Sequence, residues 1–183
     1  MNVELTLISQ SLALATVVAQ FCILLVIFYL LFFRKKYGAP AKLLAKYGLL
    51  LALLTSLVAT LGSLFYSQVM GFAPCDLCWF QRIFMYPLVV LLGMALVKKD
   101  LHIIDYALSI TVRGFIISLY QNYLYYYNGG LSAFCQLVGQ GVSCVKRYVF
   151  EFGYVTIPMM ALIAFTLLIF FLIAARYRNH AQQ

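Results

Sequence analysis

The sequence predicts an all-α integral membrane protein, and its composition and patterning both lead to that fold class. Of its 183 residues, 65% are hydrophobic and 10% are charged, whereas soluble domains average ~45–50% and about 25%. The mean hydropathy is +0.97. Burying several long apolar runs inside so small a protein would leave no polar surface, so lipid must be the solvent. A disordered chain, a nucleic-acid-binding protein and a secreted soluble enzyme are excluded.

Five stretches are long enough to cross a membrane as helices, for which about 20 residues suffice. They are Leu5–Phe33, Tyr47–Cys75, Leu77–Val97, Tyr106–Tyr127 and Phe152–Ala175. Only the third and the fourth contain a basic residue, Arg82 near one end of the third and Arg113 within the fourth. We therefore expect a five-helix membrane bundle.

The basic residues predict how this bundle is oriented. Nine lie in segments that would share one side of the membrane: Arg34, Lys35, Lys36, Lys42, Lys46, Lys98, Lys99, Arg176 and Arg178. Three lie toward the other side: Arg82, Lys146 and Arg147. Cytoplasmic loops carry the excess of Lys and Arg, so we expect the N-terminus outside and the C-terminus inside.

Three segments follow from this layout. Residues 1–46 are expected to form an N-terminal transmembrane anchor and a basic cytoplasmic loop, residues 47–175 a four-helix transmembrane domain, and residues 176–183 a cytoplasmic tail. The first helix is interpreted as a retained anchor rather than a signal peptide, because its positive charges follow the apolar run instead of preceding it.

Four of the five cysteines fall in the two segments assigned to the outside. These are Cys75, Cys78, Cys135 and Cys144, whereas Cys22 lies within the first helix and is interpreted as a small apolar residue. Disulfides persist outside the cytoplasm, while cytosolic thiols stay reduced. The two outward pairs are therefore either redox cysteines or structural bridges.

The first pair is a C-x-x-C motif, Cys75 to Cys78, where an outer loop turns into a membrane helix. Free N–H groups and the positive dipole end at a helix N-terminus stabilise a thiolate. Arg82 follows Cys78 by four residues and hence lies on the same helix face. Its cation could stabilise the thiolate or an anionic ligand, or the side chain could simply extend to the membrane surface.

The second pair, Cys135 and Cys144, encloses eight residues in a glycine-rich loop. A purely structural bridge is an alternative, since closing a small ring also stabilises the folded chain. After Cys144, apolar residues recur at helical spacing from Val145 to Phe152, with charges between them. That pattern predicts a helix lying on the membrane surface.

Other chemistries are less well supported. The 56 residues between Cys78 and Cys135 match no common zinc spacing, so we expect no metal site. His102 and His180 fall on the cytoplasmic side, and no pair of carboxylates suggests hydrolysis. Arg113 is interpreted as a side chain that extends toward the cytoplasm near Asp105.

These residues resemble the DsbB-type disulfide bond formation proteins, which are quinone-linked membrane thiol oxidases. The signature is Pro74-Cys75-Asp76-Leu77-Cys78-Trp79-Phe80-Gln81-Arg82, followed by Met85-Tyr86-Pro87. Gln81, the short loop from Cys135 to Cys144 and Thr156-Ile157-Pro158 at the start of the last helix resemble the BdbC branch. The resemblance covers Tyr47 to Ala175 and leaves the first helix as an addition to a four-helix DsbB-like bundle. In the related vitamin K epoxide reductases the C-x-x-C follows the loop pair, whereas here it precedes it.

The resemblance implies an electron route in a bacterial plasma membrane. A DsbA-like thioredoxin-fold oxidase would pass electrons to Cys135 and Cys144, these to Cys75 and Cys78, and these to the quinone pool, as ubiquinone or menaquinone. It implies that the partner attacks Cys135 and that Cys144 then attacks Cys75. Quinone is expected beside Cys78 and Arg82. A strongly oxidising partner needs a more oxidising acceptor, and quinone is one.

Two other functional classes remain open at this point. A non-catalytic membrane scaffold with two structural disulfides would contain the same four cysteines, but they would be inert. A transporter has little support, since Arg113 is the only plausible charge within the membrane.

The predicted topology can be tested by chemical labelling. After mild reduction of intact cells, an impermeant thiol reagent should modify Cys75 and Cys144, because the basic residues place both outside. Labelling that appears only after lysis would overturn the topology.

Overall fold

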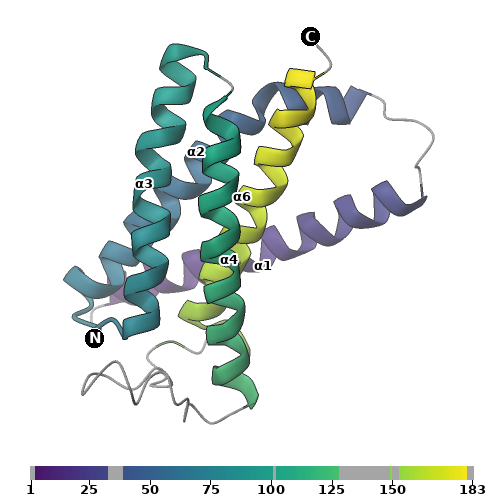
Figure 1. Cartoon of the computed structure of the whole chain (residues 1–183). Helices are drawn as coiled ribbons and strands as arrows, with labels where there is room; N and C mark the ends of the chain where they lie inside the picture. The colour runs from purple at the N-terminus through teal and green to yellow at the C-terminus, as the bar shows by residue number, and fades with distance from the viewer. Residues whose placement is uncertain (1–2, 33–38, 101, 128–148, 150–152, 181–183) are drawn as a thin grey trace.

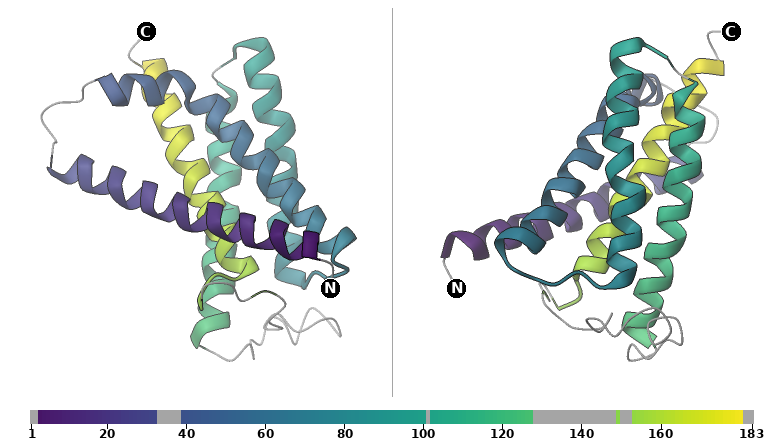
Figure 2. Two further views of the ribbon diagram at one scale, coloured as in Figure 1. Left: turned by 180° about the vertical axis from the view of Figure 1, so that it is seen from behind. Right: turned by 60° about the vertical axis from the view of Figure 1, so that its left-hand side comes forward.

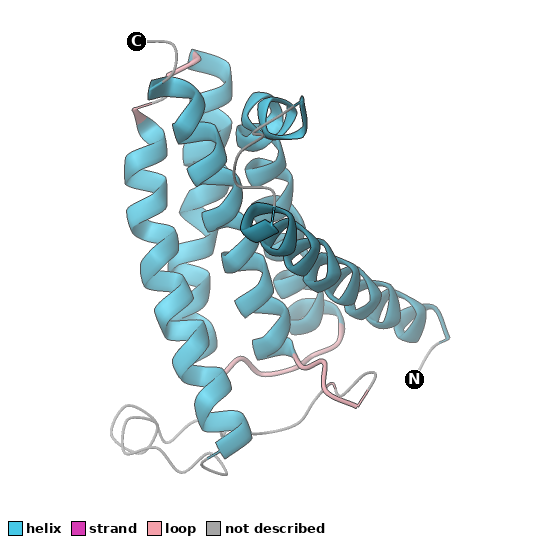
Figure 3. Ribbon diagram, turned by 90° about the vertical axis from the view of Figure 1, so that its right-hand side faces the viewer, coloured by secondary structure: helices cyan, strands magenta, loops and turns pink. Residues whose placement is uncertain are grey.

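The computed structural model describes residues 3–32, 39–100, 102–127, 149 and 153–180, and every element in them is helical (Figure 3). The elements are α1 (Val3–Phe32), α2 (Ala39–Leu64), the π-helical turn η1 (Phe65–Val69), α3 (Asp76–Lys98), α4 (Ile103–Tyr127) and α6 (Ile157–His180). Among the described residues, four segments are long and apolar enough to cross a membrane: Lys46–Val69, Asp76–Lys98, Ile103–Tyr127 and Ile157–Arg176. The all-α membrane fold class is confirmed.

Helices α2, α3, α4 and α6 form a ring in which each packs against the next and α6 returns to α2 (Figure 1). The core of the ring is apolar and fully buried, with Leu88 and Leu92 from α3 facing Phe165, Leu168 and Leu172 from α6. This is the four-helix part of the predicted bundle.

The first predicted crossing is a helix, α1, but among the described residues only Leu7–Ile23 of it counts as apolar helix, shorter than the four candidate spans, and α1 does not run parallel to the ring. It lies obliquely across α2 and α6, and it packs against α6 (Figure 2). Hydropathy predicts that a segment is helical and meets lipid, but it carries no information about the angle at which the helix packs.

Several predicted helix boundaries are wrong. The second stretch was expected to reach Cys75, yet its helix ends with η1 at Val69. The basic segment before Tyr47 was expected to be a loop, yet α2 already begins at Ala39, because a proline at Pro40 is tolerated in a first turn. The last helix was expected from Phe152 but begins at Ile157. Gly153 has a φ of +78°, which a helix cannot contain, and the Thr156 hydroxyl accepts the N–H of Met159 at 3.3 Å and so caps the helix.

The cysteine-bearing start of α3 lies at the same end of the ring as the end of α4 and the start of α6 (Figure 1). Two contacts hold this end together: the Tyr126 hydroxyl donates to the Tyr154 carbonyl at 2.6 Å, and the Asn122 amide donates to the Pro158 carbonyl at 2.8 Å. Lys98 and Arg176 lie at the opposite end.

The remaining predicted features have three different outcomes. Arg113 donates to Ser109 at 3.0 Å, one turn toward Asp105, while Asp105 itself pairs with Arg176 at 3.0 Å. Cys22 is exposed on α1. The second cysteine pair, Cys135 and Cys144, and the predicted surface helix lie outside the described residues, apart from the buried Val149.

The close approach of α4 and α6 depends on Gly114. A Cβ atom there would overlap the ring of Phe165, which is only 1% exposed and cannot move aside. We expect Gly114→Ala to lower the free energy of unfolding by ~1–3 kcal/mol, the usual cost of overpacking a core. Thermal unfolding in detergent measures this. Gly93→Ala is the matched control, because no atom lies within 4 Å of its Cβ; equal unfolding temperatures for the two variants would contradict the prediction.

Candidate active site

The C-x-x-C motif opens α3, as the sequence predicts. Cys75 is the N-cap residue, with φ −76° and ψ 168°, and its carbonyl accepts the N–H of Trp79 at 3.0 Å. Cys78 lies in the first turn. The chain reaches this point from η1 through Gly71, whose φ of +67° only glycine adopts without strain, and through Pro74, which cannot extend a preceding helix.

The two sulfur atoms lie 2.7 Å apart as free thiols in a hydrogen bond. Cys75 is buried, at 6% exposed. Its hydrogen bond to Cys78, together with burial, raises the pKa of the Cys75 thiol. A raised pKa favours the protonated form of Cys75.

A glutamine from α4 contacts both sulfurs. The Gln121 amide nitrogen donates to Cys75 Sγ at 3.3 Å and to Cys78 Sγ at 3.4 Å. Its oxygen accepts the amide of Gln81 at 2.6 Å, and both glutamines are buried. Gln81 thus fixes which end of the Gln121 amide faces the sulfurs. A donor held in this way stabilises a thiolate in a site that has little water.

Arg82 is held by α2 and by its own helix. Its Nε donates to the Ser63 hydroxyl at 2.9 Å and a terminal nitrogen donates to the Ser63 carbonyl at 3.0 Å. Its guanidinium carbon lies 5.3 Å from the centre of the Trp79 ring, a cation–π distance. These contacts hold the Arg82 guanidinium in a defined position near the end of the helix ring, so the side chain does not simply extend to the membrane surface.

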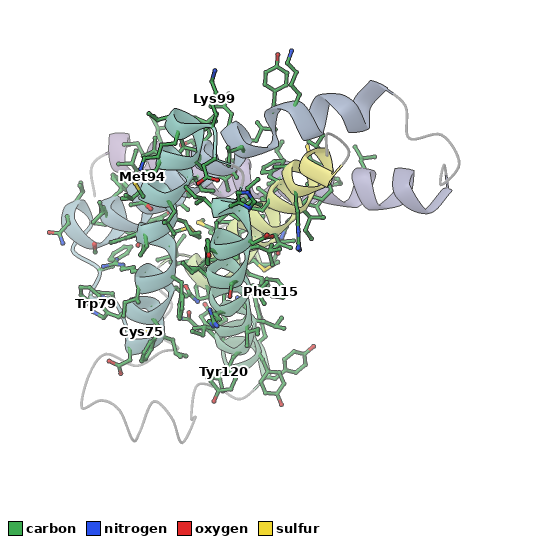
Figure 4. The ribbon with its side chains drawn as sticks, turned by 45° about the horizontal axis from the view of Figure 1, so that its top comes forward. Cys75, Trp79, Met94, Lys99, Phe115 and Tyr120 are labelled. Carbon is green, nitrogen blue, oxygen red and sulfur yellow. The ribbon has the colours of Figure 1, made fainter. Side chains whose placement is uncertain are left out.

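A cavity of about 400 Å³ opens beside this pair of sulfurs. Its lining at the cysteine end includes five polar residues, Cys75, Cys78, Gln81, Gln121 and Arg82. Most of the remaining lining is apolar and comes from α1, α2 and α6. Figure 4 shows Cys75 and Trp79 at one end of α3 and Lys99 at the other.

The structure brings together three of the five predicted site residues, Cys75, Cys78 and Arg82, around the same cavity. The sequence analysis did not identify Gln121 or Ser63 as site residues. An amide side chain within a predicted membrane helix was the available signal for Gln121, because polar residues are costly in lipid. Among the described residues no group of three or more His, Cys, Asp or Glu side chains could hold a metal ion.

The donors present suit an apolar molecule that carries carbonyl oxygens. A guanidinium and an amide can donate hydrogen bonds to such oxygens, and the apolar walls can bury the rest of the molecule. The fold and the site together define a multi-pass membrane protein of the thiol–disulfide class.

Comparison with known proteins identifies the particular family. Residues 45–175 match the family model for the disulfide bond formation protein DsbB, so the chain belongs to that family and has a role in disulfide bond formation. It is 49% identical over 120 residues to the "Probable disulfide formation protein C 1" of Bacillus anthracis, covering 66% of this chain and 85% of the relative.

Two further relatives show the same likeness. The chain is 44% identical to the "Disulfide bond formation protein C" of Bacillus subtilis, over 64% of this chain and 83% of the relative. It is 40% identical to the "Probable disulfide formation protein" of Coxiella burnetii, over 75% of this chain and 92% of the relative. No solved structure matches the chain.

The role of Gln121 can be tested by the reactivity of Cys78. We expect Gln121→Leu to slow the alkylation of Cys78 in the fully reduced protein about three- to tenfold at neutral pH. Losing a hydrogen bond to a charged group costs ~1.5–3 kcal/mol and so lowers the fraction of Cys78 that is thiolate. The higher intrinsic reactivity of a less stabilised thiolate offsets only part of this loss. Mass spectrometry of the modified peptide gives the rate. Gln81→Leu keeps the donor but frees its orientation, so its effect should be smaller. An unchanged rate of Cys78 alkylation in Gln121→Leu would show that the glutamine does not stabilise the Cys78 thiolate.

Proposed function

We propose that the chain is a membrane thiol:quinone oxidoreductase. It reoxidises a DsbA-like thioredoxin-fold dithiol oxidase outside the cytoplasm and passes the electrons to membrane quinone, either ubiquinone or menaquinone. The observation that carries the proposal is the pair of sulfurs, 2.7 Å apart, beside an apolar cavity whose polar end contains Arg82. A buried redox pair needs an electron acceptor that dissolves in lipid.

The proposed reaction is two thiol–disulfide exchanges followed by electron transfer. The partner dithiol is oxidised to a disulfide as the Cys135–Cys144 disulfide is reduced, with Cys135 as the cysteine that the partner attacks. The resulting dithiol then reduces the Cys75–Cys78 disulfide, with Cys144 attacking Cys75. The Cys75–Cys78 dithiol would then give up two electrons and two protons and return to the disulfide, and bound quinone would be the acceptor, released as quinol.

The residues around Cys78 have separate tasks in this scheme. The N-terminal turn of α3 and the Gln121 amide stabilise negative charge on the Cys78 sulfur. The hydrogen-bonded Cys75 thiol keeps its partner close enough to re-form the disulfide. The Arg82 guanidinium lines the cavity at the same end, where it can stabilise charge that develops on a ligand oxygen.

The direction of the protein in the membrane is part of the proposal. Lys98, Lys99 and Arg176 lie at the end of the ring opposite to the C-x-x-C motif. Because basic residues are retained in the cytoplasm, we place the cysteine end outside. Residues 1–46, 47–175 and 176–183 then act as anchor and basic segment, redox domain and cytoplasmic tail of a multi-pass protein of the bacterial plasma membrane.

The alternative is a scaffold with two structural disulfides and no turnover. A structural bridge would need no apolar cavity beside it and no glutamine aimed at both sulfurs. We therefore favour the enzyme.

The deciding experiment is quinone reduction by the purified protein with a reduced thioredoxin-fold dithiol oxidase as electron donor. We expect quinol to form, and we expect Cys78→Ala and Cys135→Ala to abolish its formation. Arg82→Ala should raise the quinone KM about tenfold, since a charge-assisted hydrogen bond is worth ~1.5–3 kcal/mol. Arg113→Ala is the matched control, because this arginine contacts only Ser109 among the described bonds. Inert cysteines and no quinol formation would establish the scaffold instead.

A further inference from the structure

The cavity beside the cysteine pair has a wall that does not come from the four-helix ring. Leu12, Thr16 and Ala19 of α1 line it together with residues of α2 and α6. The match to the DsbB family begins at residue 45, so α1 lies wholly outside the part of the chain that defines the family.

The ring alone leaves this side of the cavity uncovered. At the basic end, α2 and α6 are in close contact: a Cβ atom on Gly48 would lie 2.8 Å from the Phe171 carbonyl and 3.3 Å from Ala175. Toward the cysteine end the two helices diverge, and α1 crosses them there (Figure 2). The cavity lining includes Val58 and Gly62 on α2 as well as Ala161 on α6, which bound the divergent part.

One face of helix α1 packs against this opening. Ser9, Ala13 and Thr16 recur at helical spacing and are buried. The Ser9 hydroxyl lies 3.3 Å from the Tyr66 hydroxyl, in a buried hydrogen bond to η1. Gln20 accepts the Tyr154 hydroxyl at 2.8 Å, which joins α1 to the segment that precedes α6.

The opposite face of α1 consists of large apolar side chains. Leu14, Val18, Phe21 and Leu25 are each more than half exposed. A helix that turns small and polar residues inward and large apolar residues outward is typical of a packed helix with lipid on its far side. The residue pattern thus agrees with a fixed position of α1 against the ring.

We propose that α1 is part of the quinone site: it covers the opening between α2 and α6 and controls how a ligand with an apolar tail reaches the cavity from lipid. This inference rests on the proposed function. The cysteine end of the cavity holds the polar groups for the quinone head. The apolar tail of the quinone contacts the surface formed by Leu12 and Ala19. Helix α1 therefore determines which quinone tails bind, and it does not take part in the reaction at the cysteine sulfurs.

The test enlarges a single residue on either face of α1. In Ala19→Phe the new ring enters the cavity, whereas in the matched control Val18→Phe it points away, since Val18 is 53% exposed. Binding is measured from the fluorescence of Trp79, the single tryptophan, which lies beside Arg82 and which quinones quench. The probes are decylubiquinone and its tail-less dimethoxy-methyl-benzoquinone head, with phylloquinone and menadione as a second tailed and tail-less pair.

We expect the Kd of the tailed quinone to rise at least about tenfold in Ala19→Phe, because forcing a ring into space that a ligand occupies costs as much as overpacking a core. The Kd of the tail-less quinone should change less than about threefold, and Val18→Phe should match the wild type. If Ala19→Phe does not fold, Ala19→Leu makes the same comparison with a smaller side chain.

The outcomes separate the two proposals. Unchanged binding of the tailed quinone in a folded Ala19 variant, or an equal loss in Val18→Phe, overturns the role of α1 while leaving the proposed function intact. If the wild-type protein neither binds nor reduces any of the four quinones, the proposed function is overturned, and so is the proposed role of α1. The expected pattern in binding, together with quinone reduction by the wild-type protein, supports both.

Discussion

Lipid as solvent is the constraint on which the rest of this structure depends. With no water in the hydrocarbon, backbone polar groups must be satisfied within each element, so every candidate membrane span among the described residues is helical. The same constraint applies to side chains. Several polar side chains within the ring are bonded to one another or to backbone: Gln81 to Gln121, Arg82 to Ser63, and Asn122 to the Pro158 carbonyl.

These polar contacts are concentrated where the C-x-x-C motif enters the membrane. Cys75 caps α3, Gln121 reaches it from α4, and Ser63 of α2 holds Arg82. Three helices thereby converge on one helix N-terminus, the place where a thiolate is most readily stabilised. The π-helical turn η1 contributes to this convergence, because it ends α2 before the motif and leaves a short connection to Cys75. Such turns are frequent at functional sites.

The sequence could predict the helices and the position of the redox pair, because both depend on local patterns. Apolar length sets each crossing, and the C-x-x-C spacing places Cys78 one turn into α3. It could not predict the partner of Arg82, since Ser63 is 19 residues away in the chain and its position depends on packing. Gln121 was missed for the same reason: its contact with the sulfurs spans two helices. The predicted helix starts were wrong at Ala39, where the basic segment is already helical, and at Ile157, where the Thr156 cap rather than hydropathy sets the start.

The oblique position of α1 depends on the shape of the ring as well as on the buried face of the helix, Ser9, Ala13 and Thr16. Gly48 permits α2 and α6 to touch at the basic end, and helices that touch at one end and cross at an angle must separate at the other. That separation provides the volume of the cavity, and it also exposes the cavity on one side. A bilayer could fill such an opening only with acyl chains, which would compete with any apolar ligand. A helix with a narrow face of small residues can cover this opening without filling the cavity. Ala13 and Thr16 allow α1 to pack closely on the ring, while the small side chain of Ala19 leaves room in the cavity that it lines. The same geometry that creates the cavity therefore leaves one side open, and α1 has the residues to cover it.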